Sequence, residues 1–194
     1  MRLSENFWFS EFCDRDHHIL STIQMHMLSS LVHNLLEPIR AFLCESFGED
    51  IPITVRSGVR FPSDTNRLRQ AGYNPSETSD HLFGNVIKLR SQTNIRKYGK
   101  FHSFSVGAAD IVPMCGAREA WQRMRPHFLK EGYIALPSDT YAVGQIILER
   151  GNSYWLHISN PTTVVYSDHV SQTFLERPHF LLSEDNGRTY TPIT

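Results

Sequence analysis

Two short segments, ETSDHLFG at residues 77–84 and GAADIVP at residues 107–113, decide how this chain is interpreted. The 22 residues between them, NVIKLRSQTNIRKYGKFHSFSV, include no acidic residue. The first segment carries His81 in a turn-like sequence, and the second ends a run of small residues at Asp110. If the intervening segment is an insertion, His81 and Asp110 return to one site, and the two segments form a single split motif.

The bulk composition is that of one soluble globular domain. The chain has 194 residues, 40% of them hydrophobic and 20% charged, which is enough for a single core. A formal net charge of -1 excludes a global field that would attract nucleic acid or an anionic membrane. The three cysteines are too few and too widely spaced for a disulfide framework or a Cys-x-x-Cys metal site.

The N-terminus does not resemble an export signal. Residues 1–18, MRLSENFWFSEFCDRDHH, contain early acidic residues and lack an apolar run of about seven. No stretch approaches the roughly 20 apolar residues that span a bilayer. We therefore expect synthesis as a soluble cytoplasmic protein without a signal peptide. It would act on a substrate outside the cytoplasm only if another protein released it.

Helical patterns dominate the first part of the chain. Apolar residues at three- and four-residue spacing over residues 17–36 predict an amphipathic helix. Pro38 should end or kink it before a second helical piece over residues 39–47. A short helix is expected at residues 63–72, and another from Ala117 to about Arg125, where Pro126 interrupts it.

Strand patterns are expected at residues 52–61, in GAADIVP and throughout the last third of the chain. GQIILERGNSYWLHISNP, residues 144–161, predicts a hairpin, and a second is expected to turn at Asn186-Gly187. Helices followed by a mostly antiparallel sheet make the predicted class α+β.

A group of three candidate ligands emerges from the strands and the first segment. His81, Asp110 and His157 offer two imidazoles and a carboxylate, the donor set of a catalytic zinc site with its fourth position open. Such a zinc ion activates water and polarises a carbonyl. Glu149, on the strand before His157, is the candidate proton acceptor. With ten histidines in the chain, accidental trios are common, so spacing alone carries little weight.

Five segments, in order over about residues 6–160, resemble the zinc D-Ala-D-Ala peptidases. That family includes phage endolysin peptidases and the vancomycin-resistance dipeptidases. Its central motif, Ser-x-His-x-x-Gly-x-Ala-x-Asp, matches in two halves: Ser79, His81 and Gly84, then Ala108 and Asp110. The other four segments are NFWFSEF, LVHNLLEPIRAFL, ITVRSGVRFPSDTNRL and GQIILE…WLHIS.

The resemblance implies a fold, a reaction and a set of roles. The fold would be Hedgehog/D,D-peptidase-like, a small antiparallel sheet with helices packed on one side. The protein would be a monomeric, phage-type lysin that hydrolyses a D-alanine-type bond in the peptidoglycan stem peptide, as a D,D-carboxypeptidase or an endopeptidase. Zinc would be bound by His81, Asp110 and His157. Glu149 and Arg60 would be catalytic, and Arg60 and Ser79 would bind substrate.

The sequence departs from the family at the split motif. Six residues separate the metal histidine from the aspartate in ordinary members, whereas 28 separate His81 from Asp110. An insertion of about 20 residues explains this, since lengthening a surface loop costs little entropy. His102 is the rival ligand because only seven residues separate it from Asp110. Lys100 and Ser105 stand where the motif would require serine and glycine.

The expected organisation is a peptidase domain at residues 1–160, with a basic insertion at about 85–105, and an extension at 161–194 packed on the same domain. The insertion is interpreted as a solvated face, a lid, or a clamp for anionic cell-wall polymer. Two alternatives stay open. One is a catalytically idle cell-wall-binding or structural module of the same fold. The other is a nucleic-acid-binding module, although the leading interpretation includes no nucleic acid and no membrane span.

Overall fold

The computed structural model describes most of both halves of the split motif and the elements that surround them. It describes residues 1–13, 19–73, 75, 79–83, 86–88, 101–104, 107–131, 134–135, 140–141, 145–160, 163–166, 173–174, 180–185 and 187–193. For residues 86–88, 101–104, 127–131, 134–135, 140–141, 163–166 and 173–174 only the backbone is described. The expected roles of the basic insertion fall on side chains outside the described residues.

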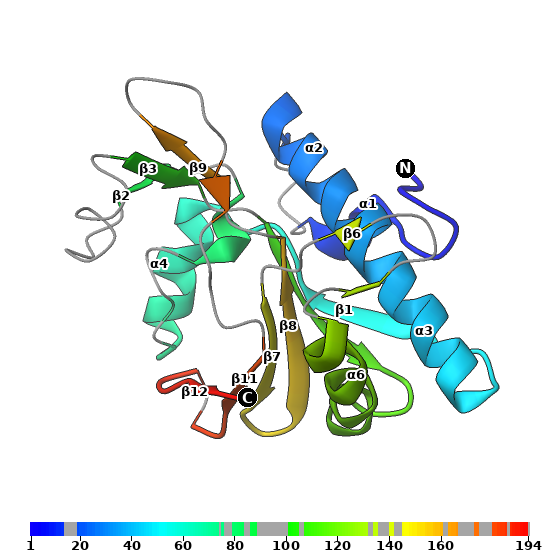
Figure 1. Ribbon diagram of the computed structural model, residues 1–194. Coiled ribbons are helices and arrows are strands. Elements are labelled where there is room, and N and C mark those ends of the chain that lie inside the picture. Colours follow the sequence, from blue (N-terminus) through cyan, green and yellow to red (C-terminus); the bar gives the residue numbers. More distant parts are fainter. Residues whose placement is uncertain are drawn as a thin grey trace.

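A six-stranded sheet forms the centre of the molecule (Figure 1). Its strands are, in spatial order, β1 (Ile53–Ser57), β4 (Ala108–Pro113), β8 (Tyr154–Ser159), β7 (Gln145–Arg150), β11 (Phe180–Ser183) and β12 (Thr191–Pro192). All neighbours are antiparallel except β11 and β7, which are parallel. The mixed helix-and-sheet class predicted from the sequence is therefore confirmed. The sheet is larger than the small sheet that was expected.

The side chains of the sheet alternate between two faces, as strand geometry requires. One face belongs to the hydrophobic core, where it contributes Ala109, Ile111, Ile146, Leu148, Leu156 and Ile158. The intervening residues of the same strands, including Asp110, Glu149 and His157, consequently face the other side. One face of the sheet thus packs into the hydrophobic core, and the opposite face carries the polar side chains Asp110, Glu149 and His157.

The long helical segment covers the core face. It consists of α2 (Thr22–Leu31), a π-helical turn η1 (Val32–Leu36) and α3 (Glu37–Phe47). The helix begins later than predicted because Ser21 and Gln24 form a capping box at its start. The π-helical turn ends two residues before Pro38, whose ring would clash in a regular helix with the carbonyl four residues earlier, that of Asn34. Gly48, at φ 70°, ends the segment.

The helix α6 (Ala117–Glu131) packs against the same face and corrects one prediction. It continues through Pro126 instead of ending at Arg125. Ala117, Ala120 and Met124 are buried against the core, and this packing stabilises the helix across the exposed proline.

Two further helices are short. The helix α1 (Phe9–Phe12), which was not predicted, buries Phe12 in the core. The helix α4 (Pro62–Gln70) begins with a carboxylate of Asp64 accepting from the backbone N–H of Phe61, at 2.8 Å. Figure 1 shows α4 on the opposite side of the sheet from α6, so the helices are not all on one side.

A second, four-stranded sheet contains the ends of the predicted insertion. Its order is β10 (Thr173–Phe174), β9 (Thr163–Tyr166), β3 (Phe101–Phe104) and β2 (Val86–Lys88), all antiparallel. A further pair joins β5 (Ile134–Ala135) and β6 (Thr140–Tyr141). The hairpin predicted at Asn186-Gly187 is confirmed by the pairing of β11 with β12, with Gly187 at φ 73°. No helix within the described part of the chain has the length and apolarity to cross a membrane.

Candidate metal centre

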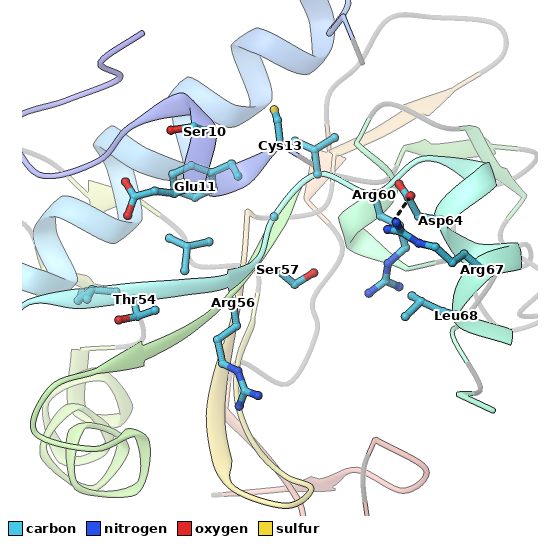
Figure 2. Close-up of a pocket in the computed structure, with 15 residues that line it drawn as sticks. Ser10, Glu11, Cys13, Thr54, Arg56, Ser57, Arg60, Asp64, Arg67 and Leu68 are labelled. Atoms are coloured by element: carbon cyan, nitrogen blue, oxygen red, sulfur yellow. Dashed lines mark hydrogen bonds and ion pairs between the residues drawn. The ribbon is translucent and has the colours of Figure 1, made fainter. Parts of the chain in front are cut away.

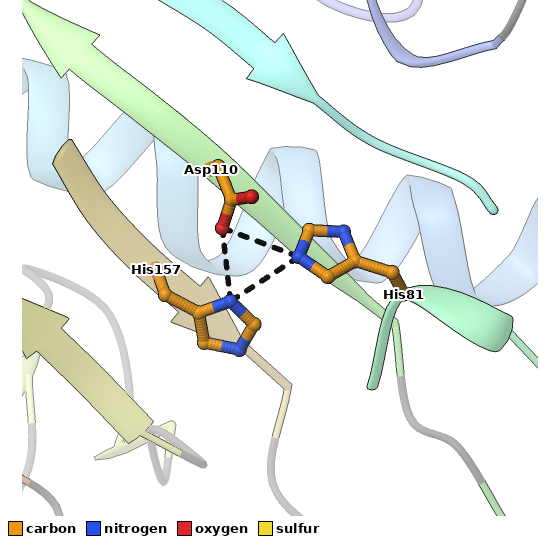
Figure 3. A group of neighbouring side chains, drawn as sticks. All are labelled: His81, Asp110 and His157. Atoms are coloured by element: carbon orange, nitrogen blue, oxygen red, sulfur yellow. Dashed lines mark hydrogen bonds and ion pairs between the residues drawn. The ribbon is translucent and has the colours of Figure 1, made fainter. Parts of the chain in front are cut away.

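Two of the candidate ligands lie side by side on neighbouring strands. Asp110 of β4 and His157 of β8 are directly opposite each other in the antiparallel register. Opposed residues of paired strands project from the same face. Accordingly, Nδ1 of His157 lies 3.0 Å from Oδ1 of Asp110 (Figure 3). The register of β4 with β8 therefore fixes two donors on the face opposite the core.

The third candidate, His81, reaches the same point from outside the sheet. It belongs to η2 (Asp80–Leu82), one turn of 3-10 helix. The hydroxyl of Ser79 caps this turn by accepting from the backbone N–H of His81. Nε2 of His81 lies 3.2 Å from both Oδ1 of Asp110 and Nδ1 of His157 (Figure 3). His81 and His157 are only 3% and 9% exposed, so this is a buried cluster.

The two halves of the split motif meet where the first half ends, near Phe83, and the second half begins, at Gly107. The backbone N–H of Gly107 donates to the carbonyl oxygen of Asp80, at 3.1 Å. Gly107 has φ 91°, and a Cβ there would lie 2.6 Å from the ring of Phe83. Only glycine suits both conditions. The segment from residue 84 to 106 thus begins and ends at neighbouring positions.

The positions of the ring hydrogens in the cluster favour a cation at its centre. Nδ1 of His81 lies 2.8 Å from the carbonyl oxygen of Gly58, so this nitrogen carries the hydrogen of the neutral ring. Nε2 then has only a lone pair and faces the carboxylate of Asp110. Both groups are hydrogen-bond acceptors, so they repel each other unless a positive group lies between them. A second ring proton or a metal ion between the atoms removes this conflict. The three side chains lie near enough to bind one metal ion.

The charges of the cluster stabilise one another. Burial alone would raise the pKa of Asp110, but the charges and hydrogen bonds of the two histidines outweigh it and hold that pKa well below its usual value. Burial alone would lower the pKa of His157, whereas the bond to Asp110 reverses the direction and raises it. The carboxylate is therefore ionised at neutral pH, as a metal ligand must be.

Glu149 lies on the same face of the sheet, beside the cluster. Glu149 is opposite Trp155 on β8, which is two residues from His157. The β7–β8 hairpin therefore directs Glu149 and His157 toward the same face of the sheet. Burial raises the pKa of Glu149, and the nearby His157 partly offsets this. A buried carboxylate with a raised pKa next to a metal site is suited to transferring protons.

Tyr190 supports Glu149 and was not anticipated from the sequence. It forms a side-chain hydrogen bond with Glu149, and the two side chains meet at Gly187. A Cβ on Gly187 would lie 3.0 Å from the Tyr190 hydroxyl and 3.4 Å from Oε2 of Glu149. The signal available in the sequence was only the Asn186-Gly187 turn, which gives no indication that the hairpin packs beside Glu149.

Arg60 and Ser79 border the cluster. Nη1 of Arg60 donates to the hydroxyl of Ser79, at 3.3 Å, and the backbone N–H of Arg60 donates to the carbonyl oxygen of His81. Burial lowers the pKa of Arg60, and the charge of Asp110 opposes this shift. Ser79 therefore braces both the turn that carries His81 and the guanidinium of Arg60.

A cleft of about 620 Å³ opens beside Asp110. Arg60, Trp155 and Tyr73 line it, together with Arg56 from the edge strand β1. A second pocket of about 580 Å³ adjoins it along β1, and Arg56 and Arg60 border both. Figure 2 shows the two arginine side chains extending from either side of Ser57. Arg56, Arg60 and Asp110 all line the first cleft, so a ligand there would lie within reach of both guanidinium groups and of one member of the cluster.

The structure brings most of the predicted site residues together. His81, Asp110 and His157 form the cluster, and Glu149, Arg60 and Ser79 surround it. His102, the rival ligand, lies on β3 of the other sheet, and its side chain is outside the described residues. His26 and His33 are exposed and lie outside the cluster.

Comparisons of this chain with protein-family models, with curated proteins and with solved structures find no match. The function is therefore argued from the site itself.

Proposed function

We propose that this protein is a zinc-dependent peptidase that hydrolyses a D-alanine-type peptide bond in peptidoglycan. The observation that carries the proposal is the buried group of His81, Asp110 and His157, with Glu149 beside it. Three protein donors and an adjacent carboxylate are the composition of a hydrolytic zinc site. The order of the five resembling segments supports the same interpretation, including a Hedgehog/D,D-peptidase fold.

The geometry of the three donor atoms fits a bound zinc ion. Atoms bound at about 2.0–2.1 Å to a tetrahedral ion lie about 3.3 Å apart. The three donor atoms are 3.0, 3.2 and 3.2 Å from one another. Two imidazoles and one carboxylate also match the ligand preference of zinc better than the all-oxygen preference of magnesium or calcium.

The surrounding residues supply the rest of the chemistry. When bound, zinc polarises the scissile carbonyl and activates water at neutral pH. Glu149 accepts the proton of the attacking water and returns it to the leaving amine. Arg60, fixed by Ser79, orients a carbonyl or carboxylate oxygen of the substrate through its planar fork. Tyr190 holds the carboxylate of Glu149 in position.

The test is hydrolysis of defined peptidoglycan fragments. The zinc-loaded protein should release D-alanine, or cut a cross-link between stem peptides, from soluble muropeptides. Treatment with a chelator should abolish hydrolysis, and zinc should restore it. Release of terminal D-alanine would indicate a carboxypeptidase, and cleavage of cross-linked dimers an endopeptidase. Wall binding without hydrolysis would instead favour the catalytically idle module.

A further inference from the structure

Strand β1 contains an irregularity at Arg56. Val55 is opposite Ile111 and Ser57 is opposite Asp110, so two steps on β1 match one step on β4. Arg56 is the extra residue of this β-bulge. A bulge bends a strand and changes the direction of its side chains, and it is common beside active sites. Here it lies next to the residue that faces the metal ligand Asp110.

The guanidinium of Arg56 is held by two other residues of the cleft. Nη1 of Arg56 donates to the hydroxyl of Ser153, at 3.0 Å. Its central carbon lies 5.8 Å from the ring centroid of Trp155. A planar guanidinium over an aromatic face keeps its outer N–H donors available for a second partner. Ser153 and Trp155 line the cleft together with Asp110.

The other charged groups at this end of the cleft are already engaged. Arg150 pairs with Glu184, at 3.3 Å. Asp185 accepts hydrogen bonds from the hydroxyls of Ser183 and Thr189 and from nearby backbone N–H groups. By contrast, Arg56 forms no ion pair with any carboxylate in the part of the chain that the structure describes. Its charge is positioned by the protein but not neutralised there.

We propose that Arg56, supported by Trp155 and Ser153, is a specificity-determining residue that binds a substrate carboxylate beside the metal centre. The inference rests on the proposed peptidase function and names its substrate class, an acidic peptide. The ligand must carry a carboxylate in addition to the groups held at the metal and by Arg60. A carboxylate matches the two parallel N–H donors of a guanidinium, which a neutral amide does not. Either a side-chain-type carboxylate or the C-terminal carboxylate has this chemistry.

The experiment compares peptides that differ in a single carboxylate. The probes are L-Ala-γ-D-Glu-L-Lys-D-Ala-D-Ala, the same peptide with the D-Glu α-carboxylate amidated, and the same peptide with the C-terminus amidated. Binding is measured by calorimetry on the zinc-loaded wild-type protein and on Arg56→Gln, each carrying Glu149→Gln so that the peptide is not hydrolysed during the titration. Arg123→Gln is the matched control, because Arg123 also lies over an aromatic ring, that of Phe47, but on α6.

Arg56→Gln should weaken binding of the unmodified peptide roughly tenfold, the usual effect of losing a hydrogen bond to a charged group. One of the two amidated peptides should bind the wild type and Arg56→Gln equally, and this identifies the carboxylate that Arg56 contacts. Arg123→Gln should bind all three peptides like the wild type.

Each other outcome has a defined meaning. Equal binding of the unmodified peptide by the wild type and Arg56→Gln, or an equal loss with all three peptides, overturns the role of Arg56. If hydrolysis persists in that case, the peptidase function stands. Arg56-dependent, carboxylate-dependent binding without hydrolysis by any variant would keep the Arg56 site and overturn the peptidase. Absence of binding and hydrolysis with every peptide would overturn both.

Discussion

The carbonyl oxygen of Gly58 lies 2.8 Å from Nδ1 of His81. This contact fixes the tautomer of the imidazole and directs Nε2 toward Asp110 and His157. Gly58 precedes Arg60 by two residues, so the same loop positions the proposed metal ligand His81 and the proposed substrate-binding residue Arg60. The backbone of the Ser57–Arg60 segment is therefore part of the candidate metal centre.

Replacing Gly58 should disturb the metal site without touching a ligand. A Cβ at Gly58 would lie 2.4 Å from the backbone carbonyl oxygen of Phe12, so the loop must shift. Gly58→Ala should therefore weaken zinc affinity by roughly 10–100-fold, the usual effect of losing an outer hydrogen bond to a ligand. The affinity is measured by competition with a chromophoric chelator.

Gly48→Ala is the matched control for this prediction. Gly48 has φ +70° with open space around it, so the substitution should cost about 1 kcal/mol of stability. It should leave zinc affinity unchanged because a Cβ at Gly48 meets nothing within 4 Å, so no part of the site has to move. Wild-type zinc affinity in Gly58→Ala would show that the Gly58 carbonyl does not orient His81.

Glu149→Gln separates metal binding from proton transfer. The amide keeps the shape of the carboxylate but does not accept a proton. Zinc content should remain that of the wild type, and kcat should fall by roughly 10²–10⁴, the range for a lost general base. Glu184→Gln is the control, since Glu184 is a second carboxylate that lines the cleft but pairs with Arg150. Near-normal turnover by Glu149→Gln would assign the base to another residue.

Tyr190→Phe should change the pH dependence of the reaction. The phenol donates to Glu149 and lowers the pKa of its carboxyl, opposing the increase caused by burial. Without the hydroxyl, the pKa of Glu149 rises further, so more of it is protonated at a given pH. The acidic limb of the kcat/KM profile should move to higher pH, with zinc content unchanged. An unmoved limb would mean that Tyr190 does not act on the ionisation of Glu149.

The sequence predicted the site better than its surroundings, for a physical reason. His157 and Glu149 lie on a hairpin with a recognisable turn, so local pairing decides that both face the same side. The return of the chain to Asp110 was predicted from the two halves of the split motif, and in the structure Gly107, at positive φ beside Phe83, occupies the point of return. These features depend on contacts between residues near in sequence or on the order of known motif pieces.

Long-range packing explains what the sequence did not indicate. Tyr190 reaches Glu149 only because β11 joins β7 in parallel, a pairing that no turn between them specifies. The bulge at Arg56 depends on the register of β1 against β4. The helix α6 passes through Pro126 because its buried face outweighs the local penalty of proline.

Zinc affinity should depend on pH through the histidines. Binding requires neutral imidazoles, so protons compete with the metal. Burial alone would lower the pKa of His157, but the bond to Asp110 raises it above its ordinary value of 6.5. As the pH is lowered, protons should therefore begin to compete with zinc above pH 6.5. Below the pKa of His157, zinc affinity should fall by roughly tenfold or more for each unit by which the pH decreases. Chelator competition across a pH series measures it, and a constant affinity from about pH 5 to pH 8 would contradict the assignment.

The most direct test of the central claim is the zinc content of purified variants, measured by atomic emission. The wild type should hold about one zinc per chain, the number that one three-donor group binds. His81→Ala, Asp110→Ala and His157→Ala should each lose most of it, whereas His102→Ala should retain it. A wild type that binds no zinc, or a His102 variant that loses zinc while the His81 variant keeps it, would contradict this metal centre.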